Sequence, residues 1–211
     1  MENKRTPIWI AKTRKTAVLS LAAILLAWNA NAAEMAGVVF NEKYEDNGIK
    51  MTLQGLGQKN VLLFKAFVAS FYRDDTVNEE ELGKFPKRIE VEYFVNIPGI
   101  KLNNFTVDSI KDNINEVEFA SLKKEIGLMR NYFVDLKPGD RFSLTYLPGV
   151  GTQFAHNGRV TGIIEGSEFA RALFSVWIGE KPFDSALKKQ ILTKDKSKSN
   201  KQNELVMLSK S

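Results

Sequence analysis

The sequence feature that most constrains the fold is a twelve-residue run, Val61 to Tyr72, in which Lys65 is the only charged residue. Both alternate sets of positions in this run are apolar. A β-strand with two apolar faces has to be covered on both sides. The run therefore predicts a central strand. The two apolar sets are Leu63, Phe67, Ala69 and Phe71 on one face, and Leu62, Phe64, Ala66 and Val68 on the other.

Further strand signals lie on both sides of this run. The segment 88–95 alternates Ile89, Val91 and Tyr93 with Glu90 and Glu92, which is typical of a strand with one solvated face. Glycines at 55 and 57 predict a break in the chain before the central strand. The pair Asn157-Gly158 predicts a tight hairpin, because both residues tolerate positive φ. The remaining predicted strands are 37–40, 49–54, 141–147, 151–156 and 159–164.

Helical patterns occupy the middle and the end of the chain. Thr106 is a candidate N-cap for a helix carrying apolar residues up to Val117, and a second apolar stripe continues to about Arg130. Ser167 and Asp184 are candidate caps for two later helices, the last one ending near Leu192. Strands, helices, strands and helices in this order predict an α+β protein, in which helices pack on a large antiparallel sheet.

The two ends of the chain differ from its body. Basic residues precede the apolar run 17–28, and Ala30 and Ala32 then match an A-x-A cleavage site, which predicts a signal peptide over 1–32 and export. An uncleaved anchor is the alternative, although twelve apolar residues are fewer than the roughly 20 needed to span a bilayer. We expect one domain over 33–192. The polar segment 193–211 is expected to be a disordered basic tail.

The charge of the chain is concentrated at these ends. The formal net charge is +5, of which residues 1–32 contribute +4 and residues 193–211 contribute +3. The body is left at about −2, so a nucleic-acid-binding body with a basic face is not expected. The chain has no cysteine, so an exported form cannot use disulfides.

Few residues suggest a metal site or nucleophilic catalysis. His156 is the only histidine and stands beside the predicted hairpin turn, where partner ligands for a metal are lacking. No G-x-S-x-G motif accompanies it, so a serine hydrolase is not expected. We therefore expect no metal, no cofactor and no catalytic residue of these classes.

Two lysines remain as candidates for binding. Lys59 directly precedes the central run and Lys65 lies within it. A cation in an apolar strand has to reach solvent, pair with an acid or hold a bound anion. Reaching solvent is the preferred interpretation for Lys65. Lys59 can face a pocket from the end of the strand.

Three segments resemble the bacterial, exported (periplasmic) branch of the chalcone isomerase-like family. They are Gly55-Leu-Gly-Gln-Lys59, the run 64–72, and 177–189 with the sequence WIGEKPFDSALKK. The resemblance covers roughly residues 35–192. It implies an open-faced β-sandwich, a large antiparallel sheet with helices packed on one face, which agrees with the pattern of strands and helices.

The resemblance also implies a site. In the plant enzymes of this family, a chalcone closes to a flavanone, a cation holds the phenolate, and hydroxyl donors stabilise the enolate. The family's arginine falls on Lys59, which keeps the charge, and its strand hydroxyl falls on Phe67, which cannot donate. A family asparagine corresponds to Asn113, and a family tyrosine falls on Thr106.

Non-catalytic members of this fold bind fatty acids, with the cation holding the carboxylate. We therefore expect an exported, periplasmic protein that binds a small lipophilic anion such as a fatty acid through Lys59, Phe67 and Asn113. The alternatives are an intramolecular lyase acting on a conjugated ketone, and a ligand-free interaction or envelope-maintenance protein. A further alternative is that Phe67 is only a core residue and Lys59 only a surface residue beside it, without a role in binding. We expect no nucleic acid as a partner, no stable membrane insertion after cleavage, and a monomer.

Overall fold

A computed structural model describes residues 32–76 and 83–193 of the chain. All of the predicted signal peptide except Ala32, and all of the predicted tail except Thr193, lie outside these residues. None of the described helices combines the length and the hydrophobicity needed to cross a membrane. The described elements are β1 (Ala32–Met35), β2 (Val38–Asn41), β3 (Lys43–Asp46), β4 (Ile49–Val61), β5 (Phe64–Arg73), β6 (Lys87–Tyr93), α2 (Gly99–Asn113), α3 (Glu116–Ser121), α4 (Lys123–Met129), β7 (Arg141–Leu147), β8 (Gly151–His156), β9 (Arg159–Ile164), α5 (Ser167–Ile178) and α6 (Ser185–Leu192).

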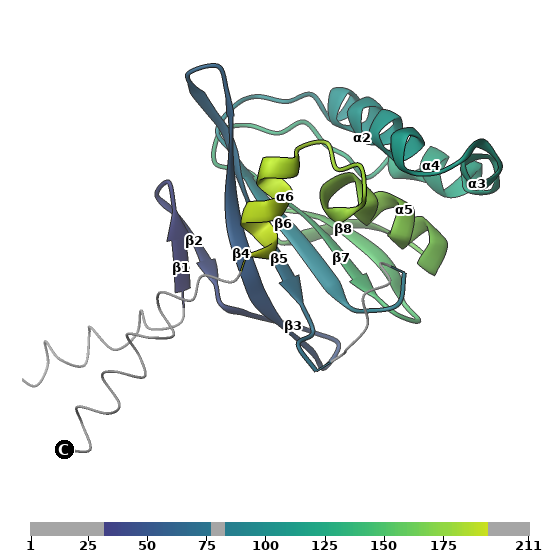
Figure 1. Cartoon of the computed structure of the whole chain (residues 1–211), viewed down its shortest axis with the longest axis horizontal. Helices are drawn as coiled ribbons and strands as arrows, with labels where there is room; N and C mark the ends of the chain where they lie inside the picture. The colour runs from purple at the N-terminus through teal and green to yellow at the C-terminus, as the bar shows by residue number, and fades with distance from the viewer. Residues whose placement is uncertain (1–31, 77–82, 194–211) are drawn as a thin grey trace, which may run out of the picture. The chain divides into compact units, whose positions relative to one another are not determined.

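The main sheet is a continuous antiparallel meander. Its seven strands follow the order of the chain from β3 to β9, while β1 and β2 form a separate two-stranded sheet. Helices α2, α5 and α6 lie over one face of the main sheet (Figure 1). The predicted α+β class and the open-faced sandwich of sheet and helices are therefore confirmed.

The main core lies between the sheet and the helices. Ile89, Val91 and Tyr93 of β6 point into it and are almost completely buried. Helix α5 supplies Phe169 and Leu173, which have no exposed surface. Removing these apolar side chains from water is the main favourable contribution to this packing.

The apolar run is central, but its first residues are not part of the core. β5 pairs with β4 on one side and β6 on the other. Phe71 is buried under the helices, and Val68 is buried on the opposite face against Val38 and Phe40. The strand begins at Phe64 rather than Val61, and Leu62 and Leu63 form the turn of the β4–β5 hairpin. The prediction of burial was wrong for residues 61–64.

The predicted glycine break before the central strand is also wrong, because Gly55 and Gly57 lie inside the long strand β4. Helix α6 packs closely on both residues. A Cβ at Gly55 would lie 2.5 Å from the carbonyl oxygen of Gln190, and one at Gly57 would lie 2.6 Å from a methyl carbon of Leu187. The glycines therefore allow the helix to approach the strand.

Of the three predicted helix caps, one is confirmed and two are wrong. Asp184 is the N-cap of α6, as predicted, and its Oδ1 accepts the Leu187 N–H at 2.9 Å. Thr106 lies inside α2, which begins at Gly99, and its hydroxyl donates to the Leu102 carbonyl oxygen. Ser167 is the first residue of α5 rather than its cap. The predicted hairpin turn is confirmed, with positive φ at Asn157 and Gly158.

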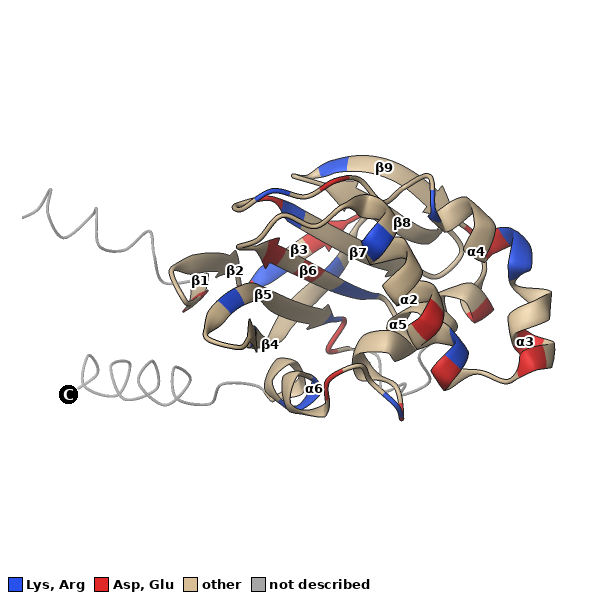
Figure 2. Ribbon diagram, turned by 90° about the horizontal axis from the view of Figure 1, so that it is seen from above, with Lys and Arg blue, Asp and Glu red and all other residues tan. Residues whose placement is uncertain are grey.

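The face of the sheet away from the helices is less solvated than the alternation in β6 predicted. Arg88 is only 6% exposed and lies 4.1 Å from the centroid of the Tyr44 ring. Arg141 pairs with Glu92 at 2.8 Å and lies over the ring of Phe40. Aromatic rings from β2 and β3 thus cover these charged groups. The charged positions of β6 can be followed in Figure 2.

Candidate functional site

Lys59 lies near the end of β4, and its ammonium group is already paired. Its Nζ lies 2.5 Å from Oδ2 of Asp184, and the two side chains are 36% and 15% exposed. Hydrogen bonding from Lys59, followed by the Leu187 N–H, lowers the pKa of Asp184. The Asp184 carboxylate therefore stays ionised at neutral pH.

Phe67 is the register partner of Lys59 on β5. Register partners on antiparallel strands project from the same face, so the stem of Lys59 and the ring of Phe67 lie side by side. The Phe67 ring packs against Tyr93, Trp177 and Phe183, with centroid separations of 5.7, 6.1 and 6.4 Å. The predicted cation thus lies at the border of an aromatic cluster.

Asn113 is the last residue of α2 and holds the loop between α5 and α6. Its Nδ2 donates to the Lys181 carbonyl oxygen at 2.7 Å and to the Ser109 carbonyl oxygen at 2.9 Å. Its Oδ1 accepts from the Lys181 N–H at 3.2 Å. The Asn113 amide therefore positions this loop, and its polar atoms are hydrogen-bonded to other groups of the protein.

The three predicted residues meet on one short loop, residues 181–184. Asn113 bonds Lys181, Phe67 packs on Phe183, and Lys59 pairs with Asp184. The residues that make these contacts lie in the segment 181–184, KPFD, in which the sequence pattern identifies Asp184 only as a helix cap. The second role of its carboxylate and the packing of Phe183 were missed.

Two hollows lie on either side of this aromatic cluster. The inner one has a volume of about 20 Å³, enough for roughly one water molecule. The outer one opens to solvent and has a volume of about 480 Å³. Phe183 lines the outer hollow and Trp177 lines the inner one, and their ring centroids are 5.0 Å apart. Neighbouring rings therefore line the two hollows.

The inner hollow is almost entirely apolar. Burial raises the pKa of Tyr93, so its hydroxyl stays protonated at neutral pH. Thr106 contributes a hydroxyl that already donates to a backbone oxygen. The residues lining the hollow are Ile89, Val91, Tyr93, Leu102, Thr106, Phe133, Phe142, Leu144 and Trp177.

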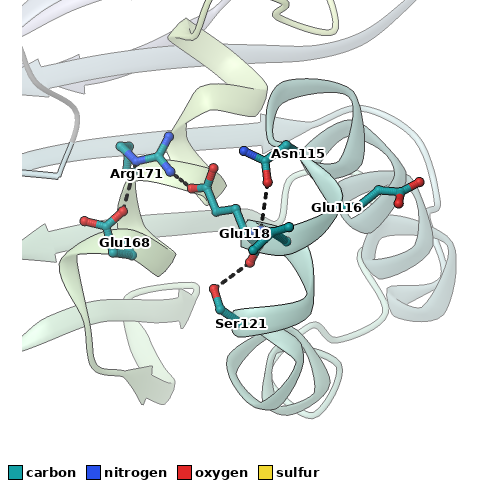
Figure 3. Close-up of a pocket in the computed structure, with 7 residues that line it drawn as sticks. Asn115, Glu116, Glu118, Ser121, Glu168 and Arg171 are labelled. Atoms are coloured by element: carbon teal, nitrogen blue, oxygen red, sulfur yellow. Dashed lines mark hydrogen bonds and ion pairs between the residues drawn. The ribbon is translucent and has the colours of Figure 1, made fainter.

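A third, open hollow between α3 and α5 has a different character (Figure 3). Arg171 pairs there with Glu118 and, at 3.2 Å, with Glu168. Asn115 accepts the Glu118 N–H and caps α3. These charged groups bind one another and tie α3 to α5. Arg171 is paired with two carboxylates here, so it is not a free cation for a ligand anion.

Lys87 is a buried cation that the sequence analysis missed, because the predicted strand began at Arg88. It is fully buried, and its Nζ donates to the Phe85 carbonyl oxygen at 2.9 Å. The rings of Phe85, Tyr146 and Phe174 surround the ammonium group at 4.3–5.0 Å. Burial, with a smaller contribution from Arg73, lowers the pKa of Lys87 to about 7.

A family model described as chalcone isomerase-like matches residues 32–193, which is most of the chain. The chain belongs to the chalcone isomerase-like family. Among solved structures, it is similar to an Arabidopsis thaliana fatty-acid binding protein, with a TM-score of 0.61 and 16% sequence identity. The match covers 77% of this chain and 96% of that one. At this identity the likeness shows the fold alone. No curated protein matches the chain.

Proposed function

We propose that this protein is an exported, periplasmic member of the chalcone isomerase-like family that binds a small lipophilic anion such as a fatty acid, without catalysis. The observation that carries the proposal is the position of Lys59, which is the register partner of Phe67 and pairs with Asp184, the residue after Phe183. A cation next to an apolar site is what a fatty acid requires. The similar Arabidopsis protein, described as a fatty-acid binding protein, supports this choice.

In the proposed complex the ligand carboxylate takes the place of Asp184 beside Lys59. Both groups are carboxylates, so they compete for one ammonium group. Asp184 can leave Lys59 and still cap α6, because the cap uses Oδ1 and the ion pair uses Oδ2. The exchange therefore does not require α6 to unfold.

The acyl chain needs more room than the inner hollow offers. The outer hollow, at about 480 Å³, lies within the range of roughly 300–1,000 Å³ that is usual for ligand sites. Rotation of Phe183 and Trp177 would connect the two hollows, because these neighbouring rings line one hollow each. We infer that the ligand displaces these rings when it binds.

The absence of a hydroxyl on Phe67 supports a binding role rather than catalysis. The isomerase reaction needs hydroxyl donors on the developing enolate. Phe67 occupies the position of the family donor, and its ring is packed among other rings. An isomerase would need another donor there.

Native mass spectrometry of the protein purified from its own host tests the proposal. We expect a co-purifying acyl chain with a free carboxylate, identified after extraction. A consistently empty protein that also fails to take up added palmitate would contradict it. Loss of chalcone absorbance above the spontaneous rate would instead support the lyase alternative.

A further inference from the structure

The turn between β4 and β5 exposes four consecutive apolar side chains. Val61 is 55% exposed, Leu62 90%, Leu63 96% and Phe64 72%. Single exposed apolar residues are common, but a contiguous exposed group marks a site of interaction. We call residues 61–64 the apolar tip.

The apolar tip extends beyond the neighbouring strand. β6 pairs with β5 from Arg73 only as far as Phe67, and the Phe94 N–H then bonds the Ala66 carbonyl oxygen. The β4–β5 hairpin continues past this point and projects from the sheet in Figure 1. Within residues 32–76 and 83–193, none of the three hydrophobic clusters includes residues 61–64.

Local turn preferences do not explain these residues. Leu62 has φ +55, a left-handed conformation in which Asn and Gly are favoured over leucine. Leucine here strains the backbone and exposes an apolar side chain. Leucine at this position stabilises neither the hairpin nor the core, which points to a role for the tip in binding.

The charge around the apolar tip is positive. The hairpin from Ile49 to Arg73 has no acidic residue, and its basic residues nearest the tip are Lys59 and Lys65, while Lys50 and Arg73 lie at its other end. Lys65 is exposed next to the tip, and Lys59 is partly exposed while it pairs with Asp184. Strands rise about 3.3 Å per residue, so these two lysines lie roughly 5–10 Å behind the end of the hairpin.

We propose that the apolar tip inserts into the surface of an anionic phospholipid bilayer, with Lys65 at the level of the headgroups. A depth of roughly 5–10 Å brings apolar side chains to the acyl boundary and cations to the phosphates. A second copy of the chain fits less well, because a tip-to-tip contact would bring like charges together. A protruding tip needs a matching groove in a protein partner but none in a bilayer.

The apolar tip also shares its hairpin with Lys59 and Phe67. Insertion would hold the proposed ligand site close to the lipid surface, from which a lipophilic anion could enter. The membrane contact itself does not depend on the proposed ligand, since vesicle binding and fatty-acid binding are measured separately.

Vesicle binding by residues 33–211 tests the proposal, because the described residues of this part, 33–76 and 83–193, belong to one compact unit. The probe is phosphatidylcholine vesicles containing about 30% phosphatidylglycerol. We expect the unmodified protein to co-sediment with them and Leu62→Asn/Leu63→Asp to bind roughly tenfold or more weakly. Asn suits the positive φ, and both sites are at least 90% exposed, so the variant should fold. Val117→Asp is the matched control, because Val117 is 82% exposed on α3, and its binding should not change.

A single label locates the contact. The chain has no cysteine, so Leu63→Cys and Val117→Cys each provide a unique thiol for an environment-sensitive fluorophore. We expect anionic vesicles to blue-shift the emission at position 63 and leave position 117 unchanged. Equal vesicle binding by the Leu62→Asn/Leu63→Asp variant, no binding by the unmodified protein, or no shift at position 63 would overturn the proposal. So would a dimer in light scattering that only the tip variant dissociates, without vesicle binding, since the tip would then join two copies.

Discussion

Lys59 of β4 and Asp184 at the start of α6 form an ion pair with an N–O distance of 2.5 Å, although 125 positions separate them in the sequence. The pair joins the long hairpin to the loop that carries Phe183. It satisfies the ammonium group of Lys59, the register partner of Phe67. A ligand carboxylate therefore has to compete with a carboxylate of the protein.

The ion pair predicts that the free energy of unfolding decreases at acidic pH. The pKa of Asp184 is lowered in the folded state, so its contribution is present above its ordinary value of 3.8 and is lost as the pH falls through the folded value. Urea unfolding at a series of pH values below about 5 measures this loss. Asp184→Asn should show a smaller loss than the unmodified protein. Identical acid dependence in the two would show that the pair does not contribute to stability.

Lys87 predicts that the free energy of unfolding also depends on pH in the basic range. Its pKa is lowered from 10.5 to about 7, so above pH 7 the unfolded chain binds a proton that the folded protein lacks. The free energy of unfolding should therefore rise between about pH 7 and pH 9. Tyr72, whose pKa is raised to about 12, would oppose this rise only at higher pH.

The variant Lys87→Met isolates this effect. It removes the buried ammonium group while keeping most of the side-chain volume, and should raise the free energy of unfolding at neutral pH by about 1 kcal/mol or more. It should also abolish most of the rise with pH. If Lys87→Met instead destabilises the protein and keeps the rise, the rings around the ammonium group outweigh its desolvation.

Close packing of α6 on β4 predicts a strong effect of one methyl group. Gly55→Ala would place a Cβ 2.5 Å from the backbone oxygen of Gln190, which cannot move without the helix. We expect a loss of about 1–3 kcal/mol in urea unfolding. Gly127→Ala in α4 is the matched control, because its Cβ meets nothing within 4 Å, and it should stabilise the protein by about 0.5–1 kcal/mol. Equal effects at both positions would contradict the packing argument.

The order of the elements could be predicted from the sequence because each one is encoded locally. Alternation in β6, the Asn157-Gly158 turn and the Asp184 cap are patterns of a few adjacent residues, and the structure confirms them. The ends of the apolar run could not be predicted in this way. Hydrophobicity alone does not distinguish a buried strand from an exposed turn, so residues 61–64 were assigned to the core.

The candidate site was predicted only in part for a similar reason. Lys59 and Phe67 could be chosen because the resemblance places the family's cation and its strand donor at these two positions. The Asp184 partner and the Lys181 contact of Asn113 depend on how α5 and α6 return to the sheet, which no local spacing encodes. Gly55 and Gly57 were misinterpreted because their partner is also a distant helix.

The most direct test of the proposed function is a palmitate titration of residues 33–211 and three variants. Lys59→Ala should weaken binding by roughly tenfold or more, about 1.4 kcal/mol, because the carboxylate loses its cation. Asp184→Asn should bind at least as tightly as the unmodified protein, because Lys59 loses its internal competitor while the α6 cap is kept. Lys111→Ala removes a lysine of α2 that pairs with the exposed Asp108 and lies over the Phe119 ring, and it should not change the affinity for palmitate. Unchanged affinity in Lys59→Ala would contradict the account and remove Lys59 from the site.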